Sequence, residues 1–397
     1  MRIGLVSKWT ASGQAIVARQ IRSALGELGH ETFVLARPGS GPRAELAGEP
    51  DPVWDQPGIT TASAHEVPLG EYEDWARAAS LELILFDENY QWDEVAALRA
   101  AGIRTVGRFV WEYFAAEHVD PARRAFETIY SLHRAERARY AEMGIASPYV
   151  QWGIHPELLA EEGSPAVPEQ GGAPPPTPPQ GEARGGGRDP GAAVRRGGAG
   201  GSGREAEHSA GVIFYFPGSF LGRRKPIRKV LKAFGRARGE HLRLLIDAQV
   251  PRNDDALREA AAADRRIELM LEDEPEAEHR ARFAACDVCL APSRWEGLGL
   301  PLFEATGFGL PVITNDRPPM SEMVLDGRSG ILVPSVRNGT ARSGIPAWDP
   351  DVDALAAAIE RLGDAAELER MRAGVAELAA ARSWSRTVED LAALVDA

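Results

Sequence analysis

Two carboxylates flank a pair of glycines in the segment SRWEGLGLPLFE, where Glu296 precedes Gly297 and Gly299 and Glu304 follows them. A connection between a strand and a helix needs only a turn residue and a cap, so the additional acids indicate a binding loop. Glycines let the backbone approach a ligand closely and leave N–H groups free to point at it. The loop therefore has the chemistry of an anion site beside a carboxylate.

Pro301 is expected to open the helix that follows, because the first helical position needs no N–H. Amides at such a helix start, with the helix dipole, favour a phosphate, and the dipole contributes about 0.3–1 kcal/mol. We expect Glu304 in the first turn, where it either stabilises the helix or accepts the hydroxyl pair of a ribose. Glu296 precedes the glycines, where no helix would stabilise it. Gly297 and Gly299 would leave such amides free to point outward.

A second loop of the same layout, FYFPGSFLGRRKP, leads to Pro226 as a helix start. The segment from residue 223 to residue 238 holds eight Arg or Lys residues and no acid, in a chain whose formal net charge is −13. Cations are disfavoured at a helix N-terminus, so Arg224 and Lys225 there indicate a bound anion. The later basic residues are expected on a solvated helix face. Nucleic-acid binding is not expected, because no stacking aromatic residues interleave the basic ones.

Strand-like and helix-like runs alternate in both halves of the chain, which is the pattern of parallel sheets with crossover helices. The fold class is therefore α/β, with two doubly wound, Rossmann-like domains. Expected helices cover residues 15–29, 92–102 and 134–144 in the first half, and a helical segment runs from 349 to the end. Expected strands cover residues 2–6, 32–36, 81–86, 104–110, 127–132, 147–152, 211–218, 242–248, 266–271, 287–293 and 311–316.

Composition divides the chain into residues 1–158, a linker at 159–210 and residues 211–397. The linker contains GGAPPPTPPQ, with five prolines in ten residues, and a glycine-rich run with almost no apolar side chain. Such a segment cannot bury enough surface to order itself, so we expect disorder. It is either a tolerated insertion or a docking segment for a partner. The last helix is expected to pack back across the domain junction.

No apolar run approaches the roughly 20 residues of a membrane span, and MRIGLVSKWT lacks the features of a secretion signal. We therefore expect a cytoplasmic protein, and contact of a small surface patch with lipid stays open. Cys286 and Cys289 lie in an apolar segment with no further ligand pair nearby, so we expect buried core and no metal site. The DPDVD pattern at residues 349–353 reads as a helix cap.

The second half resembles the donor-binding domain of retaining GT-B glycosyltransferases of the family 4 type. The resemblance covers most of residues 212–335 and is weaker near the start of the chain. Its most specific mark is the E-x7-E spacing from Glu296 to Glu304. Three segments carry it: PGSFLGRRKP, DVCLAPSRWEGLGLPLFEATGFGLPVITND and MSEMVLDGRSGILVP.

The resemblance implies two domains facing each other across a cleft. It implies that Lys225, with Arg224, holds the diphosphate of a nucleotide-sugar. Glu296 would contact the donor sugar and Glu304 the ribose. The backbone of residues 297–300 would contact phosphate or sugar, and Gly13 would belong to a first-domain loop that faces the donor. No cofactor is implied beyond the donor substrate.

The chain departs from the family pattern at two places. Ser219 stands where relatives usually carry an arginine, so Arg223, Arg224 and Lys225 could share the cationic role. Trp111 and Glu112 stand where many relatives carry a first-domain histidine. Glu112 would either assist deprotonation of an acceptor or stabilise a helix start.

Four acceptor-side or hinge residues each keep two interpretations. Asp87, Glu88 and Asn89 would contact an acceptor sugar or cap the helix near Trp92, and His155 would line the cleft or be structural.

The expected activity is metal-independent transfer of a sugar, with retention, from a nucleotide-sugar to an acceptor hydroxyl of a sugar, glycolipid or small molecule. The alternatives are an epimerase or hydrolase of the same architecture and a non-catalytic binding module.

Overall fold

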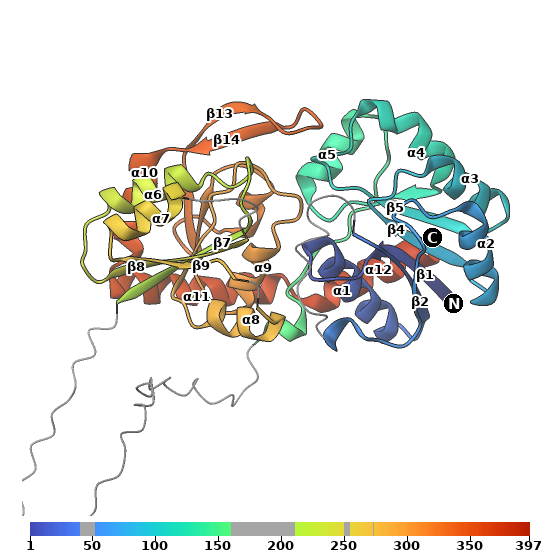
Figure 1. Ribbon diagram of the computed structural model, residues 1–397, viewed down its shortest axis with the longest axis horizontal. Helices are drawn as coiled ribbons and strands as arrows, with labels where there is room; N and C mark the ends of the chain where they lie inside the picture. Colours follow the sequence, from blue (N-terminus) through green and yellow to red (C-terminus); the bar gives the residue numbers. More distant parts are fainter. Residues whose placement is uncertain (40–51, 160–210, 250–254, 273) are drawn as a thin grey trace, which may run out of the picture. The chain divides into compact units, whose positions relative to one another are not determined.

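The computed structural model describes residues 1–39, 52–159, 211–249, 255–272 and 274–397. Two six-stranded parallel sheets dominate them (Figure 1). We call residues 1–159 the first half and residues 211–397 the second half. The expected linker lies almost entirely outside the described residues.

The first sheet has the strand order β3-β2-β1-β4-β5-β6. Leu83 and Leu85 of β4 pack in one apolar cluster, and Ile84 and Phe86 pack in another. Both faces of the sheet are therefore buried, which explains the continuous apolar run of this strand. The strands are β1 (Arg2–Lys8), β2 (Glu31–Arg37), β3 (Ile59–Thr61), β4 (Leu83–Asp87), β5 (Arg104–Arg108) and β6 (Thr128–Ile129). The helices are α1 (Gly13–Glu27), α2 (Leu69–Ala78), α3 (Trp92–Ala100), α4 (Val119–Ala125) and α5 (Arg134–Glu142).

The second sheet has the order β12-β11-β10-β7-β8-β9 and the same two-sided burial. Phe214 and Phe216 of β7 enter one cluster and Tyr215 enters the other. Its strands are β7 (Val212–Phe220), β8 (Leu242–Gln249), β9 (Ile267–Met270), β10 (Val288–Leu290), β11 (Val312–Asn315) and β12 (Gly330–Val333). Its helices are α6 (Ile227–Arg236), α7 (Asp255–Ala263), α8 (Glu276–Ala284), α9 (Leu300–Gly307), α10 (Val352–Leu362), α11 (Ala365–Ala381) and α12 (Trp384–Asp396).

An antiparallel hairpin of β13 (Ser335–Thr340) and β14 (Pro346–Pro350) follows the second sheet. Neither the hairpin nor β3 was predicted, because the hairpin residues are mostly polar and β3 has only three residues.

The predicted strand at residues 147–152 is wrong, since the segment forms only an isolated bridge between Ser131 and Tyr149. Its backbone donors bond to side chains of α12 instead. Gln151 N donates to Asp390 at 2.9 Å, and Gly153 N, just beyond it, donates to Thr387 at 2.8 Å. The chain therefore continues as an extended support for α12.

Helix α12 packs against α1 of the first half. Trp384 meets Trp152 edge to face at 5.4 Å and donates from Nε1 to Glu27 at 3.1 Å. A Cβ on Gly153 would lie 2.6 Å from the carbonyl oxygen of Ser383, so the glycine allows the two segments to meet.

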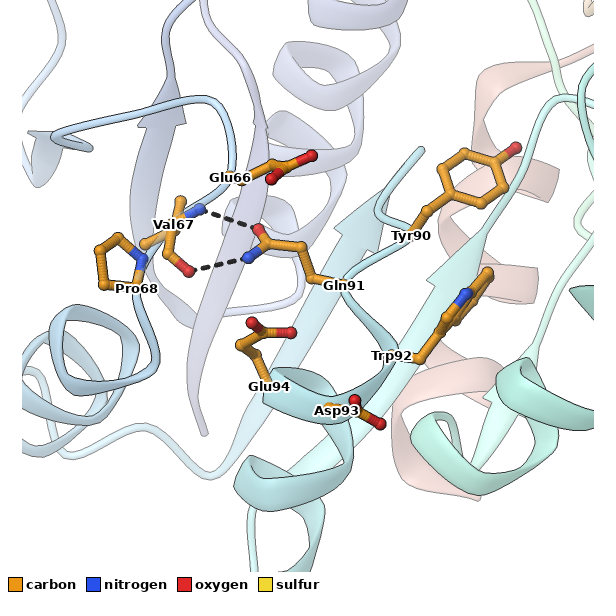
Figure 2. Close-up of a pocket in the computed structure, with 8 residues that line it drawn as sticks. All are labelled: Glu66, Val67, Pro68, Tyr90, Gln91, Trp92, Asp93 and Glu94. Atoms are coloured by element: carbon orange, nitrogen blue, oxygen red, sulfur yellow. Dashed lines mark hydrogen bonds between the residues drawn. The ribbon is translucent and has the colours of Figure 1, made fainter.

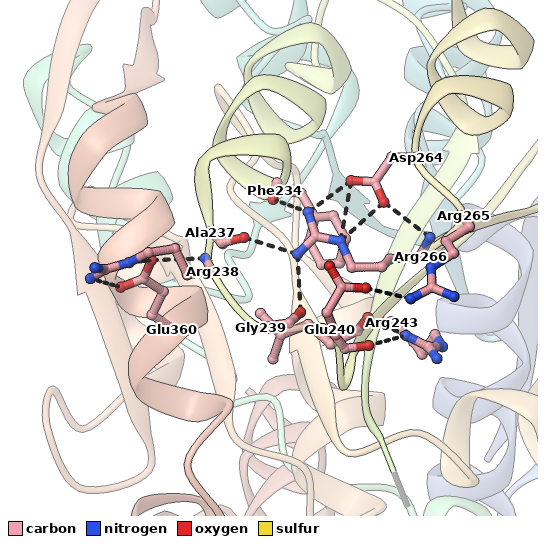
Figure 3. A network of polar contacts seen from close by, with 11 residues as sticks. Phe234, Ala237, Arg238, Gly239, Glu240, Arg243, Asp264, Arg265, Arg266 and Glu360 are labelled. Atoms are coloured by element: carbon pink, nitrogen blue, oxygen red, sulfur yellow. Dashed lines mark hydrogen bonds and ion pairs between the residues drawn. The ribbon is translucent and has the colours of Figure 1, made fainter.

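An arginine-centred network fixes the end of α6 against the strands beside it (Figure 3). Arg266 donates to the carbonyls of Phe234, Ala237 and Gly239 at 2.9–3.1 Å and pairs with Asp264 at 2.8 Å. Its guanidinium thus adds hydrogen bonds to carbonyls at and just beyond the end of α6.

None of the helices in the described parts of the chain combines the length and apolar character that a membrane span requires.

Candidate functional site

The two glycine-bearing loops of the second half meet through an ion-pair cluster around Glu296. Lys225 Nζ lies 2.8 Å from Glu296 Oε1 and 3.0 Å from Ser293 Oγ, and Arg224 Nη1 bonds to Glu296 Oε2. The side chains of Lys225 and Glu296 are only 2% and 5% exposed, whereas that of Arg224 is 31% exposed. Arg224 therefore has N–H groups that a ligand could reach.

The cluster keeps Glu296 ionised. Burial raises the pKa of the Glu296 carboxyl, but the charges of Arg224 and Lys225 outweigh it and hold that pKa at about 2. Burial lowers the pKa of the Lys225 ammonium, and Glu296 opposes this shift. We interpret the group as a carboxylate that orients two cations.

Backbone contacts fix the two loops to each other. Arg294 N donates to the carbonyl of Arg224 at 2.9 Å, and the Arg294 side chain ion-pairs with Asp349 at 2.6 Å.

Gly299 has a φ of 82°, a left-handed conformation suited to glycine, and directly precedes α9. Helix α6 begins at Ile227, directly after Pro226. The starts of α6 and α9 therefore border one cluster.

Gly13 and Gly297, two of the predicted site residues, allow the first and second halves to approach each other closely beside this cluster. A Cβ on Gly13, the first residue of α1, would lie 3.4 Å from Leu300, and one on Gly297 would lie 2.7 Å from Val110. Trp111 Nε1 donates to the carbonyl of Glu296 at 2.6 Å. Leu298 is buried. The structure thus gathers these predicted residues in one place, and their ligand-binding roles remain predictions.

Glu304 lies elsewhere in the helix than expected. Helix α9 starts at Leu300, one residue early, and has no acid in its first turn, so helix-start stabilisation does not explain Glu304. Burial raises the pKa of its carboxyl, and His279 and Arg280 oppose the shift. Its charged neighbours are thus groups of α8 together with Glu157 of the first half.

Glu112 is also not at a helix start, so that interpretation is wrong. It lies in a turn, and the next helical residues begin at Ala116. Its Oε2 is buried and has no hydrogen-bond partner within the described residues. Burial raises the pKa of its carboxyl, Arg224 lowers it and Glu296 raises it. Glu112 therefore belongs to the electrostatic environment of the cluster.

The segment at the end of β4 is mostly buried, and Asn89 Oδ1 accepts from the backbone N–H of Gln91, the residue directly before α3, at 2.9 Å. Asp87 pairs with Arg108 at 2.9 Å, and Asn89 Nδ2 donates to the Tyr72 hydroxyl at 2.8 Å. Glu88 accepts a hydrogen bond from the backbone of Val110. Burial and Asp87 raise the pKa of the Glu88 carboxyl to about 8.

A shallow pocket of about 400 Å³ opens beside this segment (Figure 2). Gln91 supports one wall through hydrogen bonds to both backbone groups of Val67, at 2.8 and 2.9 Å. Tyr90 and Trp92 lie beyond Gln91, and the acids Glu66, Asp93 and Glu94 complete the lining. Its acidic lining is unsuited to a diphosphate.

Other residues singled out in the sequence have structural positions. Cys286 and Cys289 are free and buried, which confirms the core interpretation. His155 Nδ1 accepts from Glu157 N at 3.3 Å, and its ring packs on Trp384 at 4.6 Å. Asp351, in the DPDVD pattern, caps α10 by accepting from Ala354 N at 2.8 Å, as predicted.

Three potential metal ligands lie close together outside the ion-pair cluster. Asp247, Glu274 and His279 place ligand atoms within 4.8 Å of one another. Arg282 ion-pairs with Glu274 and lies 3.9 Å from Asp247, so a cation already balances these acids. This arrangement fits a charge network of α8 better than a metal centre.

Sequence reasoning missed Ser293 and the residues of the hairpin. The Pro-Ser pair that ends β10 was visible in the sequence, but only the fold places Ser293 on Lys225.

Residues 211–364 match the family model of glycosyl transferases group 1. Among curated relatives, the GtfA subunit of UDP-N-acetylglucosamine–peptide N-acetylglucosaminyltransferase from Streptococcus pneumoniae is 31% identical over 181 residues. The D-inositol 3-phosphate glycosyltransferase of Nocardia farcinica is 31% identical over 187 residues. Each match covers 44% of this chain but only 35% and 38% of the respective relative, so the chain spans well under half of their lengths.

Solved structures show the same fold over the whole chain. The sucrose-phosphate synthase of Thermosynechococcus elongatus superposes with a TM-score of 0.67 at 17% identity. The superposition covers 100% of this chain and 98% of the synthase chain. The pneumococcal O-GlcNAc transferase GtfA, solved with UDP and GlcNAc, superposes with a TM-score of 0.64 at 14% identity, with coverages of 100% and 98%. The two Rossmann-like halves therefore form a GT-B fold.

Proposed function

We propose that the chain is a glycosyltransferase of the group 1 family, whose model matches residues 211–364, and that it transfers a sugar from a nucleotide-sugar to an acceptor hydroxyl. The observation that carries this proposal is the Glu296 carboxylate paired with Arg224 and Lys225 between two helix starts. The proposal includes retention of configuration and independence from a metal.

The donor diphosphate would lie over Arg224 and the start of α9. When the bond between the sugar C1 and the phosphate oxygen breaks, negative charge collects on the leaving diphosphate. Cations and amides already aimed there stabilise the transition state more than the bound donor. Each charge-assisted hydrogen bond of this kind contributes about 1.5–3 kcal/mol.

The acceptor oxygen would form the new bond to C1 from the face that the diphosphate leaves. The proton of the acceptor hydroxyl would pass to the leaving phosphate, which requires no protein base. Glu112 directly follows Trp111, whose indole donates to the carbonyl of Glu296. The Oε2 atom of Glu112 has no hydrogen-bond partner within the described residues, so it could accept a hydrogen bond from the acceptor hydroxyl.

The test is incubation of the protein with a panel of nucleotide-sugars, each with and without candidate acceptors. Acceptor-dependent release of nucleoside diphosphate with a glycosylated product supports transfer, and NMR of that product reports whether configuration is retained. Release without an acceptor supports an epimerase or hydrolase. Donor binding without turnover supports a binding module.

Glu296→Gln is expected to lose transfer while keeping most donor binding, because the amide keeps the shape but not the charge. Unchanged turnover in this variant would reject the assigned role.

A further inference from the structure

An open pocket of about 600 Å³ is lined by the sequence neighbours of both Arg224 and Glu296. We call it the hairpin pocket, and its volume is typical of small-molecule sites. Its lining combines the turn after β5, the two glycine-bearing loops and the tip of hairpin β13–β14: Glu112, Tyr113, Arg223, Trp295, Gly339, Thr340, Ala341 and Arg342.

The hairpin tip is held firmly against the turn that carries Glu112. Ser343 N donates to the carbonyl of Glu112 at 3.1 Å, and Ser343 Oγ donates to that of Trp111 at 2.7 Å. Ala341 and Ile345 pack with Trp111 in a small apolar cluster. The pocket wall is therefore a built feature of the fold.

Two arginines of the lining have no partner for their charge. Arg223 and Arg342 are exposed, and no ion pair or side-chain hydrogen bond joins either of them to the described residues. By contrast, Arg294 in the same region pairs with Asp349 at 2.6 Å. Two uncompensated cations in the lining of one pocket suit an anionic group, and arginine binds phosphate and carboxylate through paired N–H groups.

The rest of the lining suits a sugar. Trp295 is half-buried with the Arg294 guanidinium over its ring at 5.5 Å, and Tyr113 is 40% exposed, so two aromatic side chains border the pocket. Glu112 is only 9% exposed, and its Oε2 lacks a hydrogen-bond donor within the described residues. A bound hydroxyl would supply the donor that this buried oxygen lacks.

We infer that the hairpin pocket binds the acceptor and selects a sugar that carries a phosphate or a carboxylate, with the anion on Arg223 and Arg342 and the ring against Trp295. This assignment rests on the proposed function, since it makes the pocket the acceptor side of the transfer site. Sugar phosphates and sugar carboxylates share the feature that this pocket would recognise, which is an anionic group on a sugar.

The test measures binding directly, so that it does not depend on turnover. Isothermal titration calorimetry compares hexose 6-phosphates and hexuronic acids with their neutral parent hexoses and with inorganic phosphate. We expect at least one anionic sugar to bind about tenfold or more tightly than both its neutral parent and inorganic phosphate. The phosphate and carboxylate arms show which anion is preferred.

Arg342→Ala and Arg223→Ala are each expected to remove most of this preference. Arg337→Ala is the matched control, because Arg337 is an exposed arginine of the same hairpin outside the pocket lining. The control should retain the full preference. Because the preference should rest on charge, it should also weaken as salt is raised.

Equal binding of anionic and neutral sugars would overturn the inference, and so would an equal loss in Arg337→Ala. Binding of inorganic phosphate as tight as that of every sugar phosphate would refute a sugar site. If the preference is found but no nucleotide-sugar is turned over, the proposed function fails and the pocket assignment stands.

Discussion

Replacing Lys225 with methionine is expected to destabilise the fold by about 3 kcal/mol at pH 7. The side chains of Lys225 and Glu296 are 2% and 5% exposed, so the substitution would leave a buried carboxylate with one cation fewer. Removing one partner of such a pair costs about 3–5 kcal/mol. We expect the lower end, because Arg224 stays on Glu296.

The pKa of Glu296 gives the same order of magnitude for both cations together. A fall from the ordinary value of 4.5 to about 2 corresponds to about 3.5 kcal/mol, at about 1.4 kcal/mol per pH unit, and the charge of Arg224 lowers this pKa more than the charge of Lys225 does. Because the folded-state pKa is depressed, this stability is present above pH 4.5 and is lost as the pH falls toward 2. Lys225→Met should raise the folded-state pKa of Glu296. The loss of unfolding free energy in this variant should therefore be complete at pH 7 and should become smaller below pH 4.5.

The assay is urea unfolding followed by tryptophan fluorescence and circular dichroism, whose transitions must coincide for a single free energy. Lys232→Met is the control, because Lys232 is exposed on α6, the helix that follows Lys225, and it should change stability by less than about 0.5 kcal/mol. The double variant Lys225→Met with Glu296→Gln should recover to within about 1.5 kcal/mol of the native protein. A Lys225→Met deficit under about 1 kcal/mol, or simple additivity in the double variant, would refute the reasoning.

Three further predictions concern the support of the site. Gly153→Ala should destabilise the protein by about 2 kcal/mol in urea unfolding, because the added Cβ would lie 2.6 Å from the carbonyl oxygen of Ser383. Gly26→Ala is the control and should not destabilise the protein, because a Cβ there would have nothing within 4 Å. Arg266→Ala should cost about 2 kcal/mol in the same assay, since it removes the ion pair with Asp264 and hydrogen bonds to three carbonyls, and a cost under about 0.5 kcal/mol would contradict this. Chelation by EDTA should leave nucleotide-sugar binding unchanged in calorimetry, and a loss restored by Mg²⁺ would disprove metal independence.

The sequence predicted the two loops well because each reads as strand, glycines and proline-opened helix within a few consecutive residues. Lys225 and Glu296 could be assigned to one site in advance because parallel strands present their carboxyl ends at one edge of a sheet, but their ion pair was not predicted. Glu304 was misplaced because its distance from the helix start depends on one residue at the boundary.

Other features depend on contacts between distant segments, which no local pattern reveals. The expected strand at 147–152 lost its sheet partners to Asp390 and Thr387, more than 230 residues away. Arg342 entered no sequence argument, because its importance arises only from the hairpin tip that meets the turn at Glu112.

The most direct test of the central claim is calorimetric titration with a panel of nucleoside diphosphates. Arg224→Ala is compared with the native protein and with Arg228→Ala, an exposed arginine on α6. We predict that at least one diphosphate binds, that Arg224→Ala weakens its binding about tenfold or more, and that Arg228→Ala does not. Absence of binding throughout the panel, or equal binding by Arg224→Ala, would contradict the account.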